Sequence, residues 1–342
     1  MAENKDKDII MKCRHMEKVY PGTKALDDVD FNIYRGKVNV LIGENGAGKS
    51  TLMKQIAGIE QPSSGKMYLD GEEVSFKNTT EARAKGVGII HQELSLFPNL
   101  NVYQNIFMNN EQKKGVVVNN EIHKQKTKEV LERLEYPIDP EAKVGDLRVG
   151  QQQMIEIARN LIQDDLKILI MDEPTSSLSI NEIQMLFDIM RGLKEKGVAI
   201  LFITHKLDEV FEVADRLSVY RDGVFIGTGL IKDITESELV KMMVGREIEA
   251  FPKEAAETKG DVSIEVRNLN VEGLLHDINF HANKGEIVGF AGQVGAGRTE
   301  TMETVFGLRE HQSCEIYING QKTVIKSPAS AIKHGMAFVT ED

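Results

Sequence analysis

Short apolar runs alternate along the chain with longer segments in which apolar residues recur at helical spacing. The runs have the length of buried strands and cover residues 38–42, 167–171 and 198–204. Helical spacing covers about residues 49–57, 119–134, 151–161, 181–194 and 207–213. Apolar strands separated by helices are typical of a sheet that is buried on both faces. The pattern therefore predicts an α/β fold with a parallel core sheet.

Three shorter segments, at residues 31–34, 67–69 and 74–76, have strand-like composition and lie among turn signals. These signals are the dipeptide Asp70-Gly71 and, further along, Asp222-Gly223. Aspartate followed by glycine favours a tight hairpin turn. We therefore expect an antiparallel sheet in addition to the parallel core.

The chain contains an internal repeat. Residues 25–51 read ALDDVDFNIYRGKVNVLIGENGAGKST, and residues 274–299 read LLHDINFHANKGEIVGFAGQVGAGRT. Glycines in the two copies keep a constant offset of 249 residues: Gly36 and Gly285, Gly43 and Gly292, Gly58 and Gly307, Gly71 and Gly320, Gly86 and Gly335. A period this long indicates the duplication of a whole domain.

The repeat defines the expected domains. A complete first domain covers residues 1–248, a polar linker covers 249–260, and the N-terminal part of a second domain covers 261–342. In the alignment Glu341 corresponds to Gln92, so the later part of the first copy has no counterpart. Two full copies would give a protein of about 490 residues. We therefore expect the sequence to be a fragment.

A phosphate-binding motif follows the first buried run. Residues 43–50 read GENGAGKS and fit the pattern G-x-x-x-x-G-K-[ST] between a predicted strand and a predicted helix. Backbone N–H groups and the helix N-terminus of such a loop attract phosphates, the lysine reaches the β- and γ-phosphates, and the hydroxyl binds Mg²⁺. The alternative is a chance glycine-rich turn. The candidate nucleotide contacts are Gly43, Glu44, Asn45, Gly46, Ala47, Gly48, Lys49, Ser50 and Thr51.

Two acidic residues end the second buried run. Asp172 is a candidate for the Mg²⁺ shell, and Glu173 is a candidate general base for the attacking water. The alternative is a solvated acidic turn. Residues 147–153 read LRVGQQQ and precede a helix, so Gly150 and Gln151 could meet a phosphate from outside the domain. The alternative there is an ordinary helix start.

The order of these motifs resembles the ATPase subunits of ABC transporters. The resemblance rests on the phosphate loop, Gln92, LRVGQQQ, MDEPTSSLS and His205 in that order. It implies a P-loop NTPase fold of the ABC type, with an antiparallel β subdomain, a helical subdomain and a partial second copy. It also implies that Tyr20 stacks on adenine and that Ser177–Ser179 lie in a loop that crosses a dimer. Gln92 would sense the γ-phosphate and join Ser50 and Asp172 around Mg²⁺, and His205 would contact the γ-phosphate.

The tandem copies narrow the resemblance to ATP-binding subunits of bacterial sugar importers of the ribose, galactose/methyl-galactoside and xylose group. The galactose/methyl-galactoside type is the most similar. Supporting segments are HQELSL, GQQQMIEIAR, DEPTSSLS, MMVGR, KGEIVGFAGQVGAGRTE and VTED. The resemblance implies ATP and Mg²⁺ as cofactors, membrane permease subunits and a sugar-binding protein as partners, head-to-tail pairing of the two copies, and a peripheral place on the cytoplasmic face of the membrane.

The second copy departs from the first. Its candidate phosphate contacts are Gly292, Gly297, Arg298 and Thr299. Arg298 replaces Lys49, and in the alignment Leu269 takes the place of Tyr20. Arg148 occupies a position at which the family usually has serine. The head-to-tail pairing that the resemblance implies would bring Arg148 to the phosphate loop of the second copy. A planar guanidinium does not reproduce a compact ammonium, although Arg298 could also be an equivalent replacement. We hypothesise that hydrolysis occurs mainly at one of two sites.

Composition limits the other interpretations. The net charge of −11 argues against binding to nucleic acid, and no run of about 18 apolar residues would span a bilayer. Cys13 and Cys314 lie far apart and indicate reduced thiols. Two alternative functions stay open: a tandem ABC ATPase that acts on ribosomes or DNA, and a nucleotide-binding regulatory module without hydrolysis.

Overall fold

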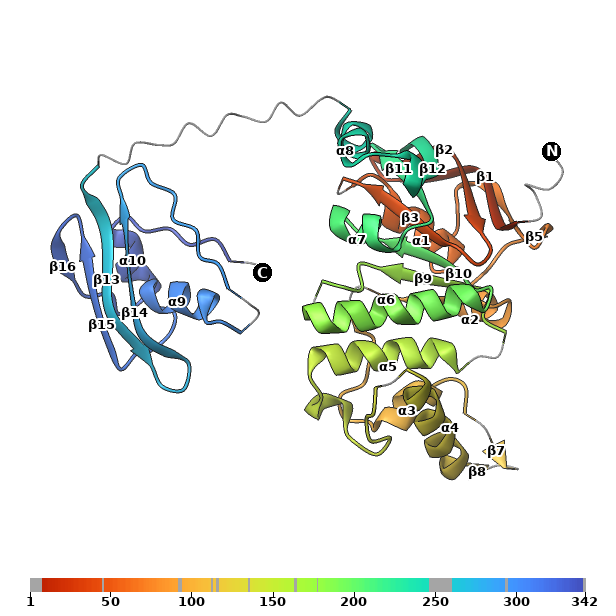
Figure 1. Cartoon of the computed structure of the whole chain (residues 1–342), viewed down its shortest axis with the longest axis horizontal. Helices are drawn as coiled ribbons and strands as arrows, with labels where there is room; N and C mark the ends of the chain where they lie inside the picture. Colours follow the sequence, from red (N-terminus) through yellow and green to blue (C-terminus); the bar gives the residue numbers. More distant parts are fainter. Residues whose placement is uncertain are drawn as a thin grey trace. The chain divides into compact units, whose positions relative to one another are not determined.

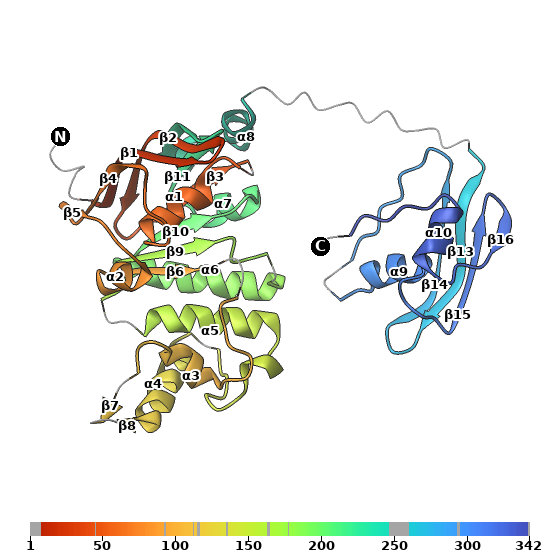
Figure 2. The ribbon, with the colours of Figure 1, turned by 180° about the vertical axis from the view of Figure 1, so that it is seen from behind.

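The structure is a computed structural model that forms two compact units, Met1–Glu249 and Ala250–Asp342 (Figures 1 and 2). It describes residues 8–44, 46–91, 94–111, 113–114, 117–134, 136–162, 165–176, 178–245, 260–292 and 295–340. Within these residues, no helix is both long enough and apolar enough to cross a membrane.

A six-stranded sheet forms the centre of the first unit. Its strand order is β12-β11-β3-β10-β9-β6, and all neighbours are parallel except β11 and β12. The strands are β3 (Val38–Gly43), β6 (Val87–Ile90), β9 (Ile168–Asp172), β10 (Ala199–Ile203), β11 (Arg216–Arg221) and β12 (Val224–Leu230). The predicted α/β fold with a parallel core is confirmed.

Alternation along the central strands explains why apolar residues follow one another in them. In β9, Ile168 and Ile170 belong to one hydrophobic core, whereas Leu169 and Met171 belong to the other. Successive side chains of a strand point to opposite faces of the sheet. Both faces of this sheet are covered, so most positions on either face are apolar, and the buried Asn39 of β3 is accommodated by hydrogen bonds to backbone carbonyls.

A four-stranded antiparallel sheet shares one of these cores with α1 (Lys49–Ile56). Its order is β2-β1-β4-β5, formed by β1 (Ile9–Tyr20), β2 (Thr23–Tyr34), β4 (Ser64–Leu69) and β5 (Glu72–Val74). The expected antiparallel sheet is present, but its last strand begins at Glu72 and ends at Val74, so of the expected segment 74–76 it includes only residue 74.

The turn at Asp222-Gly223 does not belong to that antiparallel sheet. It joins β11 to β12 and extends the central sheet. Asp70 and Asp222 have φ angles of 53° and 52°, and the glycine that follows each also has a positive φ. The two turns therefore have the same local geometry, and only the surrounding strands decide which sheet each hairpin joins.

Helices cover the central sheet and form a separate layer. Figures 1 and 2 show α3, α4 and α5 at the end of the unit opposite the antiparallel sheet, with α6 between α5 and the central sheet. The remaining elements are α2 (Thr79–Ala84), α3 (Val102–Phe107), α4 (Asn120–Arg133), α5 (Val149–Leu161), α6 (Ile180–Glu195), α7 (Leu207–Val213), α8 (Glu236–Val244), the short strands β7 (Lys113–Lys114) and β8 (Val117–Val118), and the 3-10 turns η1 (Val144–Asp146) and η2 (Ile231–Asp233).

The second unit has the same antiparallel sheet as the first. Its order, β14-β13-β15-β16, matches β2-β1-β4-β5. The elements are β13 (Val262–Val271), β14 (Leu275–Asn283), α9 (Arg298–Val305), β15 (Ser313–Ile318), β16 (Gln321–Thr323) and α10 (Pro328–Lys333).

The register of these sheets corrects one part of the sequence alignment. Met16 pairs with Val29 in the first unit, and Leu269 pairs with Ile278 in the second. Val29 and Ile278 are equivalent by the offset of 249, so Leu269 corresponds to Met16. The pair Met16–Val29 encloses residues 17–28, whereas the pair Leu269–Ile278 encloses only residues 270–277. The hairpin of the second unit is therefore shorter, and Tyr20 has no counterpart in it.

The segments equivalent to β3 and β6 form no strands in the second unit. Ile287 is 98% exposed and Val339 is 92% exposed, whereas their equivalents Val38 and Ile90 are buried. In the first unit, β9, β10 and β11 supply hydrogen bonds to β3 and β6. A strand needs such neighbours to pair its N–H and C=O groups.

Candidate functional site

The candidate site lies at the edge of the central sheet where four parallel strands end. β3 ends at Gly43, β9 at Asp172, β10 at Ile203 and β6 at Ile90. Ile203 pairs with Asp172, which places those two strand ends side by side. Ligands of open α/β sheets bind outside the carboxyl ends of the strands.

Close backbone contacts hold the loop between β3 and α1. A Cβ atom at Gly43 would lie 2.1 Å from the carbonyl oxygen of Tyr220 on the neighbouring strand β11. Gly48 has a φ of +92°, and a Cβ atom there would lie 2.6 Å from the carbonyl oxygen of Ala25. Only glycine fits these two positions without movement of the backbone. The loop thus passes tightly against its neighbours into the N-terminus of α1.

Lys49 reaches back over this loop. Its Nζ donates hydrogen bonds to the carbonyl oxygens of Gly43 and Glu44, both at 2.8 Å. Lys49 is only 6% exposed. Burial lowers the pKa of its ammonium, while the carboxylates of Glu173 and Asp172 act in the opposite direction. The loop, the lysine and the two acids therefore form one electrostatic cluster.

The other loop residues lie around Lys49. Gly46 has a φ of +83°, and the Ala47 N–H donates to the Glu44 carbonyl at 3.1 Å. Ser50 is exposed and Thr51 is half-buried in the first turn of α1. The Ser50 hydroxyl is thus accessible beside the buried ammonium.

Asp172 and Glu173 differ in their surroundings although they are adjacent. Burial, and then the neighbouring Glu173 carboxylate, raise the pKa of Asp172. Glu173 has a φ of 45°, which is unusual for a residue with a side chain, and its N–H donates to the Ile203 carbonyl at 3.0 Å. This bond fixes Glu173 between the ends of β9 and β10.

His205 lies within reach of Glu173. Its Nδ1 is 3.1 Å from Oε1 of Glu173, and its side chain is 55% exposed against 18% for the glutamate. Next to it, the Lys206 ammonium lies 3.1 Å from Oε1 of Glu209 and 3.4 Å from the Thr175 carbonyl. His205 therefore presents one ring nitrogen to the acid, with most of the ring facing solvent.

Tyr20 lies close to α1, the helix that follows the phosphate loop. Its hydroxyl donates to Oε2 of Glu60, and Lys18 Nζ is 5.2 Å from the centre of its ring. Burial, and then the Glu60 carboxylate, raise the pKa of Tyr20, while a hydrogen bond with Thr51 acts in the opposite direction. The Thr51 contact places the ring near the start of α1.

Gly150 and Gln151 lie in the first turn of α5. Oε1 of Gln151 accepts a hydrogen bond from the Arg148 N–H at 3.0 Å. A Cβ atom at Gly150 would lie 1.8 Å from Oε1 of Glu182 on α6. Among the described residues, no hydrogen bond joins Gly150 or Gln151 to the loop at residues 43–51.

Sequence reasoning missed Glu182. It accepts hydrogen bonds from the N–H and the hydroxyl of Ser179 at 2.8 and 2.7 Å, and from the Tyr136 hydroxyl at 3.4 Å. A serine followed three residues later by glutamate is the signature of a capping box, so the sequence carried this signal. Glu182 thereby connects the start of α6 to the start of α5.

Three predicted residues, Asn45, Gln92 and Ser177, lie outside the described residues. In the second unit, Gly297 precedes α9 with a φ of +83°, and a Cβ atom at Gly292 would lie 2.9 Å from that of Ala296. Arg298 and Thr299 are exposed.

The two loops differ most at their basic residue. Lys49 is buried and bonded to two carbonyl groups. Arg298 is exposed, and within the described part of the chain it makes no hydrogen bond or ion pair. The segment before Arg298 forms no strand, so no sheet edge holds that loop in place.

The central sheet, the loop before α1 and the added antiparallel sheet define a P-loop ATPase fold of the ABC type. The family profile described as ABC transporter matches residues 26–176 and 275–342. The chain therefore belongs to the ABC transporter family.

Known proteins agree with this assignment. A "Putative ribose/galactose/methyl galactoside import ATP-binding protein" of Halalkalibacterium halodurans is 48% identical over 95% of this chain and 62% of its own length. A relative of the same description in Agrobacterium fabrum is 47% identical over 96% of this chain and 64% of its own length. The chain thus spans less than two thirds of the length of either relative. The crystal structure of the ADP conformation of an ATP-binding cassette of an ABC transporter matches 70% of this chain and 99% of its own, with a TM-score of 0.60 and 28% identity.

Proposed function

We propose that the chain binds ATP at residues 43–51 and hydrolyses it to power the import of a monosaccharide. The observation that carries this proposal is the cluster at the end of the central sheet. There, Lys49 lies over the loop carbonyls, within the electrostatic field of Asp172 and Glu173, and Glu173 contacts His205.

Phosphate binding follows from the loop and the lysine. The loop leads into the N-terminus of α1, where free N–H groups and the helix dipole attract anions. When ATP binds, the Lys49 ammonium exchanges its hydrogen bonds with the carbonyl groups of Gly43 and Glu44 for hydrogen bonds with the β- and γ-phosphates. The Tyr20 ring stacks on the adenine from its position beside Thr51.

Hydrolysis requires a base and a group that positions it. Glu173 accepts a proton from the attacking water, and its backbone hydrogen bond to Ile203 keeps the carboxylate at the strand end. His205 holds the Glu173 carboxylate through Nδ1 and contacts the γ-phosphate with the exposed part of its ring. Gln92 would complete this set.

The residues present fit a magnesium ion that is shared with the nucleotide. In the described residues, no group of three or more histidine, cysteine, aspartate or glutamate side chains forms a metal site. Mg²⁺ in such ATPases needs only a few protein ligands because phosphate oxygens and water complete its shell. Ser50 and Asp172, with Gln92, would hold it, and the ion would neutralise charge on the phosphates.

Transport is inferred from the relatives. Their names describe ATP-binding proteins for the import of ribose, galactose or methyl galactoside. We extend this role to the whole protein to which the chain belongs. It would act at the cytoplasmic face of the membrane with permease subunits and a sugar-binding protein, and its two nucleotide-binding copies would pair head to tail.

The two loops would not be equivalent in this function. The buried, bonded Lys49 and the exposed Arg298 support fast turnover at the first loop and weaker nucleotide use at the second. Residues 43–51 therefore supply the main ATP site of the chain.

Binding and hydrolysis can be tested separately. Lys49→Ala should weaken the binding of a fluorescent ATP analogue to the chain by at least about tenfold. Arg298→Ala should change the affinity for the analogue only slightly. In the whole protein, Glu173→Gln should retain ATP binding but lose hydrolysis and the uptake of labelled ribose or galactose. Equal effects of Lys49→Ala and Arg298→Ala would contradict the unequal loops, and normal turnover in Glu173→Gln would contradict the proposed base.

A further inference from the structure

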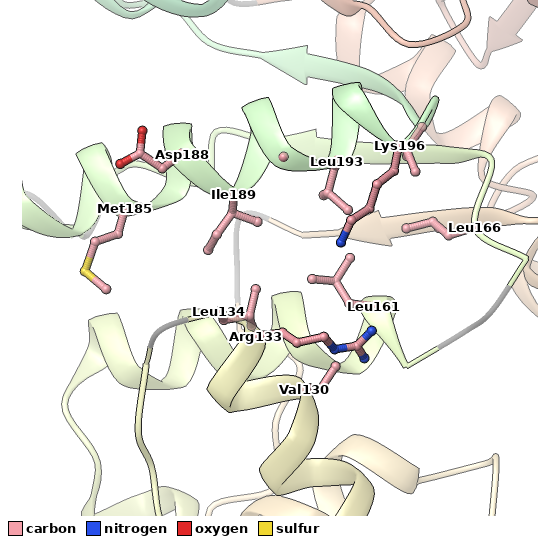
Figure 3. Close-up of a pocket in the computed structure, with 12 residues that line it drawn as sticks. Val130, Arg133, Leu134, Leu161, Leu166, Met185, Asp188, Ile189, Leu193 and Lys196 are labelled. Carbon is pink, nitrogen blue, oxygen red and sulfur yellow. The ribbon is translucent and has the colours of Figure 1, made fainter.

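A cavity of about 620 Å³ opens in the first unit between α4, α5 and α6 (Figure 3). Its walls include Val130 and Leu134 of α4, Leu161 of α5, and Ile189 of α6. None of the candidate nucleotide contacts lines it. The volume falls in the range of about 300–1,000 Å³ that is typical of pockets for small molecules.

The cavity lies at the C-terminal end of α5 and along α6 from Met185 onward, and both helices begin near the candidate site. α5 and α6 start close together, where Glu182 contacts Gly150. They also end close together, since Leu161 and Leu193 line the same cavity. The cavity extends along α6 from Met185 to Lys196, which is about 8 to 24 Å from the start of this helix, and its lining contains none of the candidate site residues. It is therefore a separate site.

Two cations and one carboxylate line the cavity. Arg133 extends into it from α4 and Lys196 from the end of α6 (Figure 3). Within the described part of the chain, neither side chain makes an ion pair or a side-chain hydrogen bond. Asp188 also lines the cavity, but its carboxylate is paired with Arg191 at 2.7 Å.

Gly192 keeps this space open. It lies inside α6 with an ordinary helical backbone, and a Cβ atom added there would meet no atom within 4 Å. Glycine inside a helix costs about 1 kcal/mol relative to alanine. Neither a positive φ nor a close neighbour requires glycine at this position. What the missing side chain provides is room in the cavity.

We propose that this cavity binds a small amphipathic anion, with an apolar body against the three helices and a carboxylate or phosphate head between Arg133 and Lys196. The apolar walls would bury the body, and the two cations would form charge-assisted hydrogen bonds with the head. The volume of about 620 Å³ suits a free small molecule with one alkyl chain.

The test uses octyl phosphate and octanoate as probes, measured by isothermal titration calorimetry with the chain. Both should show saturable binding with one site per chain. Inorganic phosphate, which lacks the body, and octyltrimethylammonium, which reverses the charge, should bind at least about tenfold more weakly. Equal binding of octyltrimethylammonium would overturn the assignment to an anion, and binding only to vesicles that contain phosphatidylglycerol would overturn the assignment to a free small molecule.

Two pairs of variants locate the site. Gly192→Leu places a branched side chain in the space beside α6 and should weaken binding at least about tenfold, whereas Gly192→Ala adds one methyl group and should retain it. Both replace a helical glycine and so should raise the melting temperature, which separates lost binding from lost folding. Lys196→Glu should weaken binding about tenfold, whereas Lys126→Glu, at an exposed site on α4 away from the cavity, should not. Unchanged binding in both Gly192→Leu and Lys196→Glu would overturn the proposal.

Discussion

The backbone of Glu173 stores strain at the candidate catalytic base, and this strain can be measured. Its φ of 45° lies in the left-handed region. For a residue with a Cβ atom, this conformation costs about 1–2 kcal/mol. The hydrogen bond from its N–H to the Ile203 carbonyl at 3.0 Å, together with the sheet on either side, holds the residue there. Glycine would adopt the same conformation without that cost.

A comparison of Glu173→Gly with Glu173→Ala isolates this strain. Both variants remove the carboxylate and its contact with His205, so they differ only in the Cβ atom. The glycine variant should be more stable than the alanine variant by about 1 kcal/mol. For a unit of this size, the difference corresponds to a melting temperature higher by about 2–4 °C. Neither variant should hydrolyse ATP.

Scanning calorimetry suits this comparison because it can resolve the transition of the unit that contains Glu173. The chain has no tryptophan, so far-UV circular dichroism provides the second measurement. The control is the same pair of changes at Glu129, an exposed residue inside α4. There the order should reverse, because alanine is the better helix former by about 1 kcal/mol. An alanine variant at position 173 that is as stable as the glycine variant, or more stable, would refute the argument.

Three further predictions follow from single contacts. Gly43→Ala should destabilise the first unit by about 3 kcal/mol in denaturant unfolding, because the new methyl group would lie 2.1 Å from the Tyr220 carbonyl oxygen; an unchanged midpoint would contradict this close approach. Asp172→Asn should stabilise the first unit, and the stability difference between the variant and the unchanged chain should grow between pH 4 and 7. Burial and Glu173 raise the pKa of Asp172, so the unchanged chain loses stability as the pH rises through that raised value, and the variant does not. A melting temperature difference that shrinks as pH rises would refute it. Burial raises the pKa of the Cys13 thiol to about 12 and that of Cys314 to about 11, so a thiol reagent at pH 8 should label Cys314 before the fully buried Cys13; the reverse order would show that Cys13 is accessible.

Much of the fold was predictable because its signals are local. The central strands alternate between two cores, and that arrangement leaves a continuous apolar run in the sequence. The loop at residues 43–50 and the acids at 172–173 are likewise contiguous segments between a strand and the next element. Since parallel strands end at one edge of a sheet, Lys49 and Asp172 could be predicted to belong to one site, whereas His205 was expected there only because of the resemblance to the ATPase subunits of ABC transporters.

Other features depend on neighbours that are distant in the sequence. Leu269 was aligned with Tyr20, but strand pairing makes it the equivalent of Met16, because the hairpin between β13 and β14 is shorter. The Asp222-Gly223 turn has the same local geometry as Asp70-Gly71, and only its pairing with β3 places its hairpin on the central sheet.

The sequence by itself determined the α/β class, the repeat and the residue types at the candidate site, because spacing along the chain encodes periodicity and motifs. The tertiary structure decided how those residues are held: Lys49 is buried and bonded, Arg298 is exposed, and Glu173 is strained between two strands. It also decided that Arg133 and Lys196 face one cavity. Burial, strain and unpaired charge arise from contacts between segments that fold together, and no local pattern records them.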